Sequence, residues 1–583
     1  MMPGMQRPNL ILILVDDLGW KDTSAYGSTF YETPNIDRLA REGMRFTDAY
    51  AASPVCSPTR ASIMTGRYPA TVGITNYIPG TEKGKLLPAP YLHYLPREVR
   101  TVARALKEGG YHTFHVGKWH LGDEPSWPEH HGFDVNVGGC DWGVPKHGYF
   151  SPYGNPRLED GPPGEYLTDR LTSEAIELLE RCNDAPFFLH LSHYAVHVPV
   201  QAPLHLVEKY TEKARQAGLD AVNPFREGEH FPTEDKRLRR VCRRVLQSDP
   251  AYAAMIENLD WNVGRIIATL ERLGIASNTF VFFYSDNGGL ATAESSPTCN
   301  APLAEGKGWM YEGGVREPLV AWCPGTVAPG TTCAVPVTSP DFYPTMLDIA
   351  GLPPEPGQHV DGTSFFPLLR GERKIDREAI FWHYPHYGNQ GGTPGSSVRA
   401  GPFKLIEFFE DNRLELYNLD NDIGEREDLS ADLTATRDKL YAMLRDWRAS
   451  VNARIPVPNP EYPFYTFDAY SRHEGPLTRP PGEPLSMSIS FSAANPQLYT
   501  VPLADLLDGF TGRLVFLVVE GDALAGTIED DGAGTLSFHD TIVESTRMLD
   551  ALLDAAGLVG VRVRLRTWNS PDDGHGVVKF ESC

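Results

Sequence analysis

Short apolar segments alternate with amphipathic segments along roughly the first 350 residues of this 583-residue chain. The apolar segments are short and continuous, which is typical of strands covered on both faces. The segments between them carry apolar residues at helical spacing, and several end in glycine. This alternation predicts an α/β fold with a large, mostly parallel sheet between layers of helices. The strands are expected at residues 9–15, 111–116, 186–192, 278–285 and 318–323. The helices are expected at residues 33–43, 101–110, 171–182 and 253–274.

The pattern changes near residue 376. Residues 379–419 indicate short antiparallel strands separated by turns, and residues 433–451 indicate one amphipathic helix. A proline-rich segment follows, and the last part of the chain mixes strand-like runs with a helical pattern at residues 541–557. The expected organisation is a large domain at 1–375, a smaller antiparallel α+β domain at 376–455, a linker at 456–486 and an additional C-terminal α+β extension of unknown role at 487–583.

Composition narrows the classes of function. Hydrophobic residues make up 41% and charged residues 22% of the chain, as in a typical globular protein. The formal net charge of -23 argues against a nucleic-acid partner, so an anionic ligand would need a local pocket of cations. The apolar run at residues 10–15 is too short for a signal peptide or a membrane span. We therefore expect a cytoplasmic protein with no membrane association, or a periplasmic or secreted one if a leader was removed.

The cysteines do not indicate a disulfide scaffold. Eight cysteines are sparse for a chain of this length, and none forms a zinc-type pair. Cys323 and Cys333 could bridge a loop or remain two free thiols.

Polar side chains stand at the ends of the predicted strands. The first strand ends in Asp16 and Asp17, and the fourth ends in Asp286 and Asn287. The carboxyl ends of parallel strands meet at one edge of the sheet, so these oxygen donors should converge. Converging carboxylates repel one another unless a cation lies among them, and such donors suit Ca²⁺ or Mg²⁺. The structural alternative is that Asp17 and Asp286 only cap the following helices.

A second set of side chains at the same edge is cationic or protonable. Lys118 and His120 follow the second strand, His197 follows the third, and Lys307 lies beyond the fourth. Together with a metal ion they could hold a tetrahedral anion. Taken singly, each histidine is more often structural than catalytic.

One cysteine stands at the start of a predicted helix. Ser57 is a good N-cap, Pro58 a favourable first helical residue and Gly66 a good stop, so Cys56 should lie just before the helix. The helix N-terminus favours an anion there, and Arg60 lies one turn further on. Cys56 could be a packed small residue, a thiolate nucleophile or a precursor. Soft sulfur does not match a hard-oxygen metal site, which favours an oxygen at this position.

The motifs together resemble the type I, formylglycine-dependent sulfatases of the alkaline phosphatase superfamily. "CSPTRASIMTG" matches the family's C-x-P-x-R signature, and "VDDLGW", "GKWHLG", "AVHVPVQAP", "SDNGG" and "GKGWMYEGGVREP" follow in the family's order. The resemblance covers residues 9–450, is nearest to bacterial carbohydrate sulfatases, and implies a catalytic large domain that hydrolyses sulfuric esters.

The resemblance also implies cofactors and residue roles. In this family a formylglycine-generating enzyme converts the cysteine to formylglycine (3-oxoalanine), whose hydrate supplies an oxygen nucleophile. A bound Ca²⁺ is expected ahead of Mg²⁺ or Mn²⁺. The implied metal ligands are Asp16, Asp17, Cys56, Asp286 and Asn287. The other implied catalytic residues are Arg60, Lys118, His120, His197 and Lys307.

The implied roles divide among these side chains. Arg60 would steady the nucleophile, Lys118 and Lys307 would hold sulfate oxygens, His120 would bond to the hydrated aldehyde, and His197 would protonate the leaving oxygen.

The substrate is less defined by the sequence. A sulfated small molecule or glycan is expected, and residues 383–411 resemble sulfatases that act on galactose or N-acetylgalactosamine sulfates. The candidate substrate-binding residues are His193, Trp142, His383 and His386. The alternative is that these side chains only pack, His193 in the core and the others between domains. Two other functions stay open: a formylglycine-dependent phosphonate or phosphate monoester hydrolase, and a non-catalytic sulfoglycan-binding protein. A homo-oligomer is also left open.

Overall fold

The computed structural model describes residues 7–182, 185–460 and 462, together with eight strands between residues 464 and 582. The chain divides into two compact units, Met1–Val457 and Pro458–Cys583, and each is described by itself. Within the described residues, no helix has the length and apolar character needed to cross a membrane.

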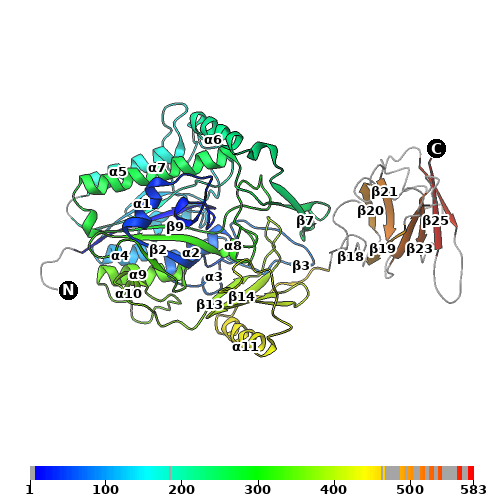
Figure 1. Cartoon of the computed structure of the whole chain (residues 1–583). Helices are drawn as coiled ribbons and strands as arrows, with labels where there is room; N and C mark the ends of the chain where they lie inside the picture. Colours follow the sequence, from blue (N-terminus) through cyan, green and yellow to red (C-terminus); the bar gives the residue numbers. More distant parts are fainter. Residues whose placement is uncertain are drawn as a thin grey trace. The chain divides into compact units, whose positions relative to one another are not determined.

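A mixed sheet forms the centre of the first unit. Its strands lie in the order β11-β2-β10-β9-β1-β6-β4-β5, and β12 also pairs with β2. Pairing is parallel from β9 through β1 and β6 to β4 and β5. The expected fold class is therefore confirmed, with helices on both sides of the sheet (Figure 1). The strands are β1 (Asn9–Val15), β2 (Met44–Tyr50), β4 (His112–Gly117), β5 (Val135–Val137), β6 (Phe187–Ser192), β9 (Thr279–Ser285), β10 (Arg316–Trp322), β11 (Thr331–Cys333) and β12 (Val337–Thr338).

The central strand β1 is buried on both faces because its alternate residues enter two different cores. Ile11, Ile13 and Val15 pack into one core, and the leucines between them pack into the other. Figure 1 shows the two helical layers on opposite sides of the sheet. The helices contributing to the first core are α1 (Pro34–Glu42), α5 (Leu167–Arg181), α6 (Leu204–Gln216) and α7 (Pro250–Arg272). Those contributing to the second core are α2 (Cys56–Thr65), α4 (Val102–Glu108), α9 (Phe342–Ala350) and α10 (Phe366–Leu369).

One part of the sheet differs from the sequence-based expectation. The strand expected at residues 318–323 is β10, which runs antiparallel to both of its neighbours. One of these neighbours, β2, was not expected, because Arg45, Thr47 and Asp48 interrupt any apolar run. Hydrophobic periodicity identifies buried strands but does not determine the direction in which they pair.

A smaller antiparallel sheet joins the first unit through its own apolar face. In this sheet, Trp382 and Tyr384 pack with Tyr50, Val55 and Val315 of the large domain. The opposite face packs against α11 (Thr434–Ser450). The strands follow one another as β13 (Ile380–Tyr384), β14 (Gly395–Ala400), β15 (Phe403–Phe408) and β16 (Leu414–Asn418). The boundaries expected at residues 375, 455 and 486 stay predictions.

A buried ionic contact also fastens the small sheet. Lys404 Nζ on β15 lies 2.9 Å from Glu312 Oε1 and 2.9 Å from Glu425 Oε1, and all three side chains are fully buried. Glu312 begins the short helix α8 (Glu312–Val315) and also pairs with Arg316 at 3.1 Å. Removing one partner of a buried ion pair of this kind lowers the free energy of unfolding by several kcal/mol, because the other charge is left buried without compensation.

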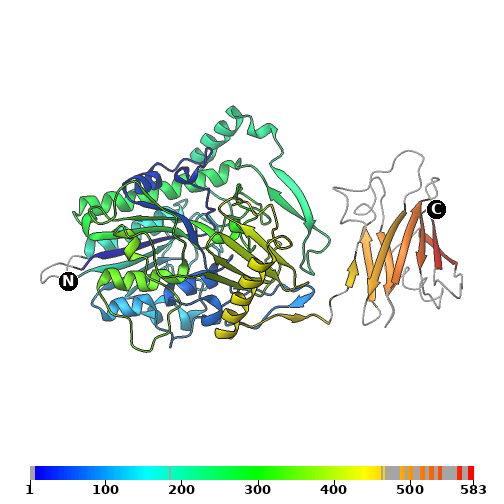
Figure 2. The same cartoon turned by 60° about the horizontal axis from the view of Figure 1, so that its bottom comes forward.

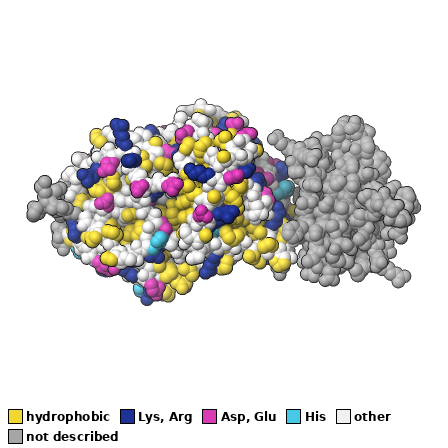
Figure 3. Space-filling model, turned by 90° about the horizontal axis from the view of Figure 1, so that it is seen from below, with side chains coloured by type: hydrophobic (Ala, Val, Ile, Leu, Met, Phe, Trp, Pro, Cys, Tyr) yellow, Lys and Arg dark blue, Asp and Glu magenta, His cyan; other side chains and the backbone are white. Residues whose placement is uncertain are grey.

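The hairpin of β7 (Phe225–His230) and β8 (Arg240–Arg244) extends from the layered body of the first unit (Figure 2). Acidic and basic side chains are interspersed with hydrophobic ones on the face seen in Figure 3, so charge of one sign does not gather there. The first unit also contains two short elements, α3 (Pro69–Val72) and β3 (Leu86–Leu87).

The second unit contains antiparallel strands. Six of them form a sheet in the order β18-β19-β22-β23-β25-β24, and β20 pairs with β21. The helix expected at residues 541–557 and most of the expected linker lie outside the described residues. The strands are β18 (Phe464–Thr466), β19 (Ser486–Ser492), β20 (Gln497–Pro502), β21 (Arg513–Val518), β22 (Leu524–Asp530), β23 (Leu536–Asp540), β24 (Val561–Arg566) and β25 (Gly576–Ser582).

The ionic contact at Lys404 gives a stability prediction. Lys404→Met should lower the free energy of unfolding by about 3–5 kcal/mol, because Glu312 and Glu425 lose their shared buried cation. Urea unfolding followed by fluorescence measures the change. The matched control is Lys439→Met on exposed α11 surface, which should change stability by no more than about 0.5 kcal/mol. Equal stability of the two variants would contradict the assigned role of Lys404.

Candidate functional site

Strand register brings the predicted oxygen donors together. Val15 of β1 pairs with Ser285 of β9, so the two acidic segments leave adjacent strands at the same level. The backbone N–H of Asp17 lies 3.3 Å from Asp286 Oδ1, and Asn287 Nδ2 lies 2.8 Å from Asp17 Oδ1. These are therefore not separate helix caps but one buried cluster at the carboxyl edge of the sheet.

The helix at this edge begins two residues earlier than expected. Cys56 is the first residue of α2, Val55 occupies the N-cap position, and Gly66 ends the helix in a left-handed conformation as predicted. The expectation of Ser57 as the N-cap is wrong, because its hydroxyl makes tertiary contacts instead. It donates to the carbonyl of His120 at 2.9 Å and accepts from the backbone N–H of Ile78 at 3.2 Å.

Each carboxylate of the cluster has a cationic partner. Lys118 Nζ donates to Asp16 Oδ2 at 2.6 Å, and Lys307 Nζ donates to Asp17 Oδ2 at 2.8 Å. The guanidinium of Arg60 makes the corresponding contact with the third carboxylate, with Nη2 2.7 Å and Nε 2.8 Å from Asp286 Oδ2. Three carboxylates and three cations therefore balance at a site with almost no solvent exposure.

The hydrogen bonds of His197 define its tautomer. Its Nδ1 lies 3.0 Å from the carbonyl of Val198, and a carbonyl can only accept, so Nδ1 carries the hydrogen. Its Nε2 lies 2.9 Å from Lys307 Nζ and 3.4 Å from Asp17 Oδ2. Nε2 therefore accepts a hydrogen bond from the ammonium of Lys307, and the proton between these two nitrogens belongs to Lys307.

His120 has the opposite arrangement. Its Nε2 donates to the carbonyl of Ile78 at 2.7 Å, which leaves Nδ1 as the unprotonated nitrogen. Nδ1 is buried and has no hydrogen-bond partner among the described residues. His120 can therefore accept a proton at Nδ1 from a hydroxyl group placed in the site.

Burial determines much of the protonation of the cluster. It raises the pKa of Asp286 to about 6 despite the opposing charge of Arg60. It lowers the pKa of His197 to about 4, although Asp17 acts in the opposite direction, and it lowers the pKa of His120 well below its ordinary value. Both rings are therefore neutral near pH 7.

The thiol of Cys56 does not have the properties of a thiolate nucleophile. Burial raises the pKa of the Cys56 thiol above its ordinary value, and the lysines Lys118 and Lys307 only partly oppose this effect. A reactive cysteine needs a lowered pKa and access to solvent, whereas this thiol is buried.

The cluster fits a hard divalent cation. Asp16 Oδ1 and Asn287 Oδ1 are buried and lack hydrogen-bond partners among the described residues. Unpaired buried oxygens are costly, and a cation coordinated by them would remove that cost. Ligand atoms of Asp16, Cys56 and Asp286 lie within 4.8 Å of one another. Sulfur is the unfavourable member of this donor set, and an oxygen at residue 56 would complete it.

Two residues of the site have strained backbones. Asp17 has φ of 60° and His120 has φ of 59°, both in the left-handed region that non-glycine residues avoid. Each costs on the order of 1–3 kcal/mol, so the surrounding contacts must enforce it. Both residues lie where the chain turns away from the ends of β1 and β4.

The candidate substrate-binding residues lie in different surroundings. His193 is buried, and burial lowers the pKa of its ring to about 3. Trp142 lies under the ammonium of Lys146, which is 4.9 Å from the centre of its ring. A Cβ at the next residue, Gly143, would be 2.6 Å from the His120 ring, so this loop packs directly against the site.

The other two candidates belong to the small sheet and its loop. The ring of His383 lies 2.7 Å from Ser396 Oγ and 2.9 Å from the carbonyl of Arg454, so both nitrogens have protein partners. The ring of His386 lies 2.8 Å from Thr75 Oγ1, in the segment that leads to Ile78. Contact with substrate stays a prediction for all four candidates.

Two contributors to the site were not identified from the sequence. Ser192 ends β6 and accepts from Arg60 Nη1 at 2.6 Å. The sequence could have indicated Ser192, because it ends a predicted strand. That strand, β6, lies between two strands that end at the site. The carbonyl of Ile78 fixes His120, and a backbone group of this kind leaves no signal in the sequence.

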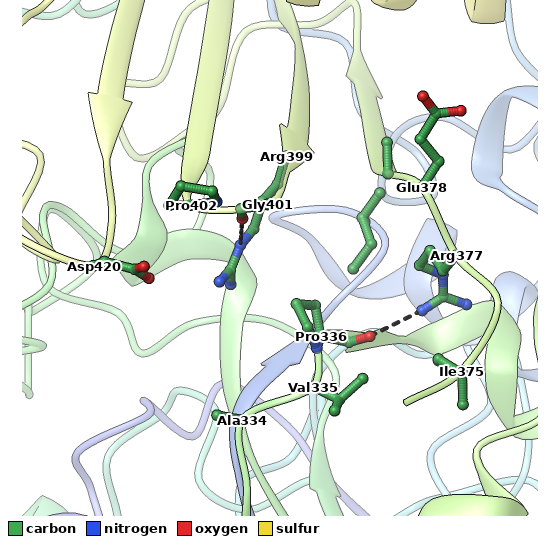
Figure 4. Close-up of a pocket in the computed structure, with 12 residues that line it drawn as sticks. Ala334, Val335, Pro336, Ile375, Arg377, Glu378, Arg399, Gly401, Pro402 and Asp420 are labelled. Carbon is green, nitrogen blue, oxygen red and sulfur yellow. Dashed lines mark hydrogen bonds between the residues drawn. The ribbon is translucent and has the colours of Figure 1, made fainter. Parts of the chain in front are cut away.

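A separate cavity of about 380 Å³ lies between the small sheet and the segment of residues 334–336 (Figure 4). Its arginines have partners of their own. Arg377 pairs with Asp341, and Arg399 lies 2.7 Å from Asp48. None of the predicted site residues lines this cavity.

Comparison with known proteins gives concordant matches. A model of the Sulfatase family matches residues 8–352, and one described as N-sulphoglucosamine sulphohydrolase, C-terminal, matches residues 305–449. A Formosa agariphila protein named Sulfatase is 34% identical over 531 residues, covering 77% of this chain and 90% of that protein. The N-acetylgalactosamine-6-sulfatase of Mus musculus is 31% identical over 461 residues, covering 74% and 78%. The crystal structure of Ps i-CgsB in complex with k-i-k-neocarrahexaose matches with a TM-score of 0.60 and 29% identity, covering 76% and 93%.

The unpaired oxygens give a prediction about cation binding. Protein stripped with EDTA should bind one divalent cation. Asp16→Asn should raise the dissociation constant for this cation at least about tenfold, because a charged ligand is lost. Isothermal titration with CaCl₂ and with MgCl₂ measures this. Asp37→Asn on α1 is the control and should leave the affinity unchanged. Stripped wild-type protein that took up neither cation would contradict the assignment.

Proposed function

Because this chain belongs to the sulfatase family and is a sulfuric ester hydrolase, we propose that it removes sulfate from a carbohydrate of the galactose or N-acetylgalactosamine type. We propose that it does so with a formylglycine made from Cys56 and a bound Ca²⁺. The observation that carries this proposal is the position of Cys56, whose Sγ lies within 4.8 Å of ligand oxygens of Asp16 and Asp286 at the N-terminus of α2.

Two relatives support the carbohydrate class. One is named N-acetylgalactosamine-6-sulfatase, and the solved structure of another holds k-i-k-neocarrahexaose. Both relatives match this chain over about three quarters of its length. The name of the first and the bound ligand of the second each refer to a carbohydrate, which is the basis for proposing a carbohydrate substrate here.

The charge balance of the site supports an anionic substrate. The carboxylates are matched by Arg60, Lys118 and Lys307, and both histidines are neutral, so the protein side chains alone are close to neutrality. Asp16, Asp17, Asp286, Asn287 and residue 56 would hold the cation. When bound, Ca²⁺ supplies positive charge that stabilises an anionic oxygen. The resulting excess of positive charge favours an incoming sulfate ester.

Residue 56 is positioned for a nucleophile made of oxygen. As formylglycine, it supplies a hydrated aldehyde whose hydroxyl can attack sulfur and whose aldehyde is restored when sulfate leaves. The N-terminus of α2 directs backbone N–H groups toward this position. Arg60, fixed by Asp286 and Ser192, adds a permanent positive charge one helical turn away.

The histidines supply the proton transfers. His120 Nδ1 is the free acceptor and would take the proton of the attacking hydroxyl. The leaving oxygen needs a proton, and the pair of Lys307 and His197 holds one between Nζ and Nε2 at 2.9 Å. Lys307 and Lys118 would contact sulfate oxygens, because they are the lysines already directed into the cluster. Removing one such charge typically costs about 10²–10³ in rate.

Modification of Cys56 is the direct test of the nucleophile. In protein co-expressed with a formylglycine-generating enzyme, the peptide containing residue 56 should be about 18 Da lighter than the unmodified cysteine form. Mass spectrometry measures the difference. Cys56→Ala should lose nearly all turnover of 4-nitrophenyl sulfate, whereas Cys299→Ala, which removes another buried free thiol, should retain it. Near-wild-type activity of Cys56→Ala would show that the nucleophile assignment is wrong.

A substrate panel tests the carbohydrate class and the phosphonate alternative together. The value of kcat/KM for N-acetylgalactosamine 6-sulfate or another sulfated galactose should exceed that for 4-nitrophenyl sulfate at least about tenfold, because sugar contacts add transition-state binding. An aryl phosphonate should be cleaved more slowly than the aryl sulfate. Activity restricted to aryl or steroid sulfates would contradict the carbohydrate assignment, and faster cleavage of the phosphonate would favour the alternative hydrolase.

A further inference from the structure

The loop between Asn287 and Lys307 contains an unusual run of strained residues. Ala293, Glu294, Ser295 and Ser296 have φ values of 157°, 48°, 77° and 40°, and none of them is glycine. Side chains rarely adopt this region, and each such residue costs on the order of 1–3 kcal/mol. Strain of this extent persists only where neighbouring contacts enforce it, and it is concentrated at functional sites.

Several contacts enforce the conformation of this loop. Ser296 Oγ accepts from the backbone N–H of Ala293 at 2.8 Å, and the N–H of Ser296 donates back to the carbonyl of Ala293 at 2.8 Å. Arg244 from β8 donates to the carbonyl of Ser296. At the other end, Thr292 Oγ1 donates to the carbonyl of Gln390 at 2.9 Å. The loop is therefore held between the β7–β8 hairpin and the loop after β13.

The same neighbours orient the carboxylate of Glu294. Asn389 Nδ2 donates to Glu294 Oε1, and Lys236 Nζ donates to Asn389 Oδ1 and, at 2.9 Å, to the Asn389 carbonyl. Three segments that are distant in the sequence thus converge on one half-buried carboxylate. Asn389 occupies one oxygen of Glu294 and leaves the second carboxylate oxygen for another donor.

The loop that carries Glu294 packs against the segment that carries Lys307. Trp309, two residues after Lys307, donates from Nε1 to Thr292 Oγ1 at 3.1 Å. A Cβ added at Gly308 would lie 2.5 Å from Oε1 of Gln390, the residue after Asn389, and the backbone N–H of Gly308 donates to the carbonyl of Pro54 at 2.8 Å. These contacts place the loop of Glu294 at the rim of the site, beside the segments that deliver Lys307 and Cys56.

A carboxylate at this position has a restricted choice of ligands. It repels the sulfate group that Lys307 is proposed to hold, so it does not serve that part of the substrate. It accepts strong hydrogen bonds from hydroxyl groups, which a sugar presents beside its ester and a simple aryl ring does not. The segment carrying Lys236 also lines a cavity of about 460 Å³, whose walls include Glu82, Lys83, Glu234 and Arg237.

We infer that Glu294, oriented by Asn389 and Lys236, binds hydroxyl groups of the sugar that carries the sulfate ester. This inference rests on the proposed function and makes Glu294 a specificity residue, with Asn389 as its positioning residue. Discrimination follows because a sugar satisfies the fixed carboxylate, whereas an aryl leaving group without hydroxyls leaves it without a partner.

The test compares two substrates with one set of variants. Glu294→Gln should lower kcat/KM for N-acetylgalactosamine 6-sulfate, or for the panel sugar sulfate cleaved fastest, by about 10–100-fold, since a charged acceptor is lost. It should change kcat/KM for 4-nitrophenyl sulfate by no more than about twofold. Asn389→Ala should raise KM for the sugar sulfate with a smaller change in kcat. The control is Glu229→Gln on β7, where Glu229 pairs with Arg243 instead, and both substrates should be unaffected.

A binding measurement separates sugar contact from general damage. The desulfated sugar should inhibit 4-nitrophenyl sulfate hydrolysis by the wild type, and its inhibition constant should rise about tenfold or more in Glu294→Gln. Equal losses on both substrates, or no loss on either, would overturn the inference while wild-type sugar cleavage keeps the proposed function intact. A wild type that cleaves 4-nitrophenyl sulfate but no sugar sulfate would overturn both the carbohydrate assignment and this inference.

Discussion

The burial of three carboxylates with three cationic side chains at one sheet edge is the constraint on which the rest of the site depends. Asp16, Asp17 and Asp286 would repel one another in a dry environment, and each is compensated by one of Lys118, Lys307 and Arg60. The compensation is incomplete, because buried oxygens of Asp16 and Asn287 lack hydrogen-bond partners among the described residues. The arrangement is therefore adapted to receive a cation, and with a cation to receive an anion.

The fold fixes the positions of these charges because the elements that carry them, β1 and α2, are completely buried. Alternate residues of β1 enter two cores, so a one-residue shift of the strand that delivers the first two aspartates would move every side chain into the opposite core and disturb the packing of both. Helix α2 is buried along its whole length and presents Cys56 at its first residue. The small sheet adds a second layer of support, since His386 holds the segment leading to Ile78, whose carbonyl orients His120.

The chemistry of the site follows from the same burial. Low exposure keeps His197 and His120 neutral, and hydrogen bonds to backbone carbonyls decide which nitrogen of each ring is free. It also keeps the Cys56 thiol protonated, which is consistent with an oxygen nucleophile derived from this residue. At the rim, a strained backbone and the hydrogen bond from Asn389 fix Glu294. The fold therefore maintains an unfavourable backbone conformation to position a group outside the charged cluster.

The sequence by itself determined the α/β class, the long amphipathic helices and the strand ends that carry Asp16, Asp17, Asp286 and Asn287. Hydrophobic periodicity and the position of polar residues after apolar runs are local signals, and they survive in a single sequence. The antiparallel direction of β10, the tertiary role of Ser57 and the contact of Ser192 with Arg60 needed the structure. Only the tertiary structure also decided the tautomers of the histidines and the convergence of Lys236, Asn389 and Glu294. These features depend on contacts between residues far apart in the chain, and the physical pairing of such residues leaves no periodic trace in the sequence.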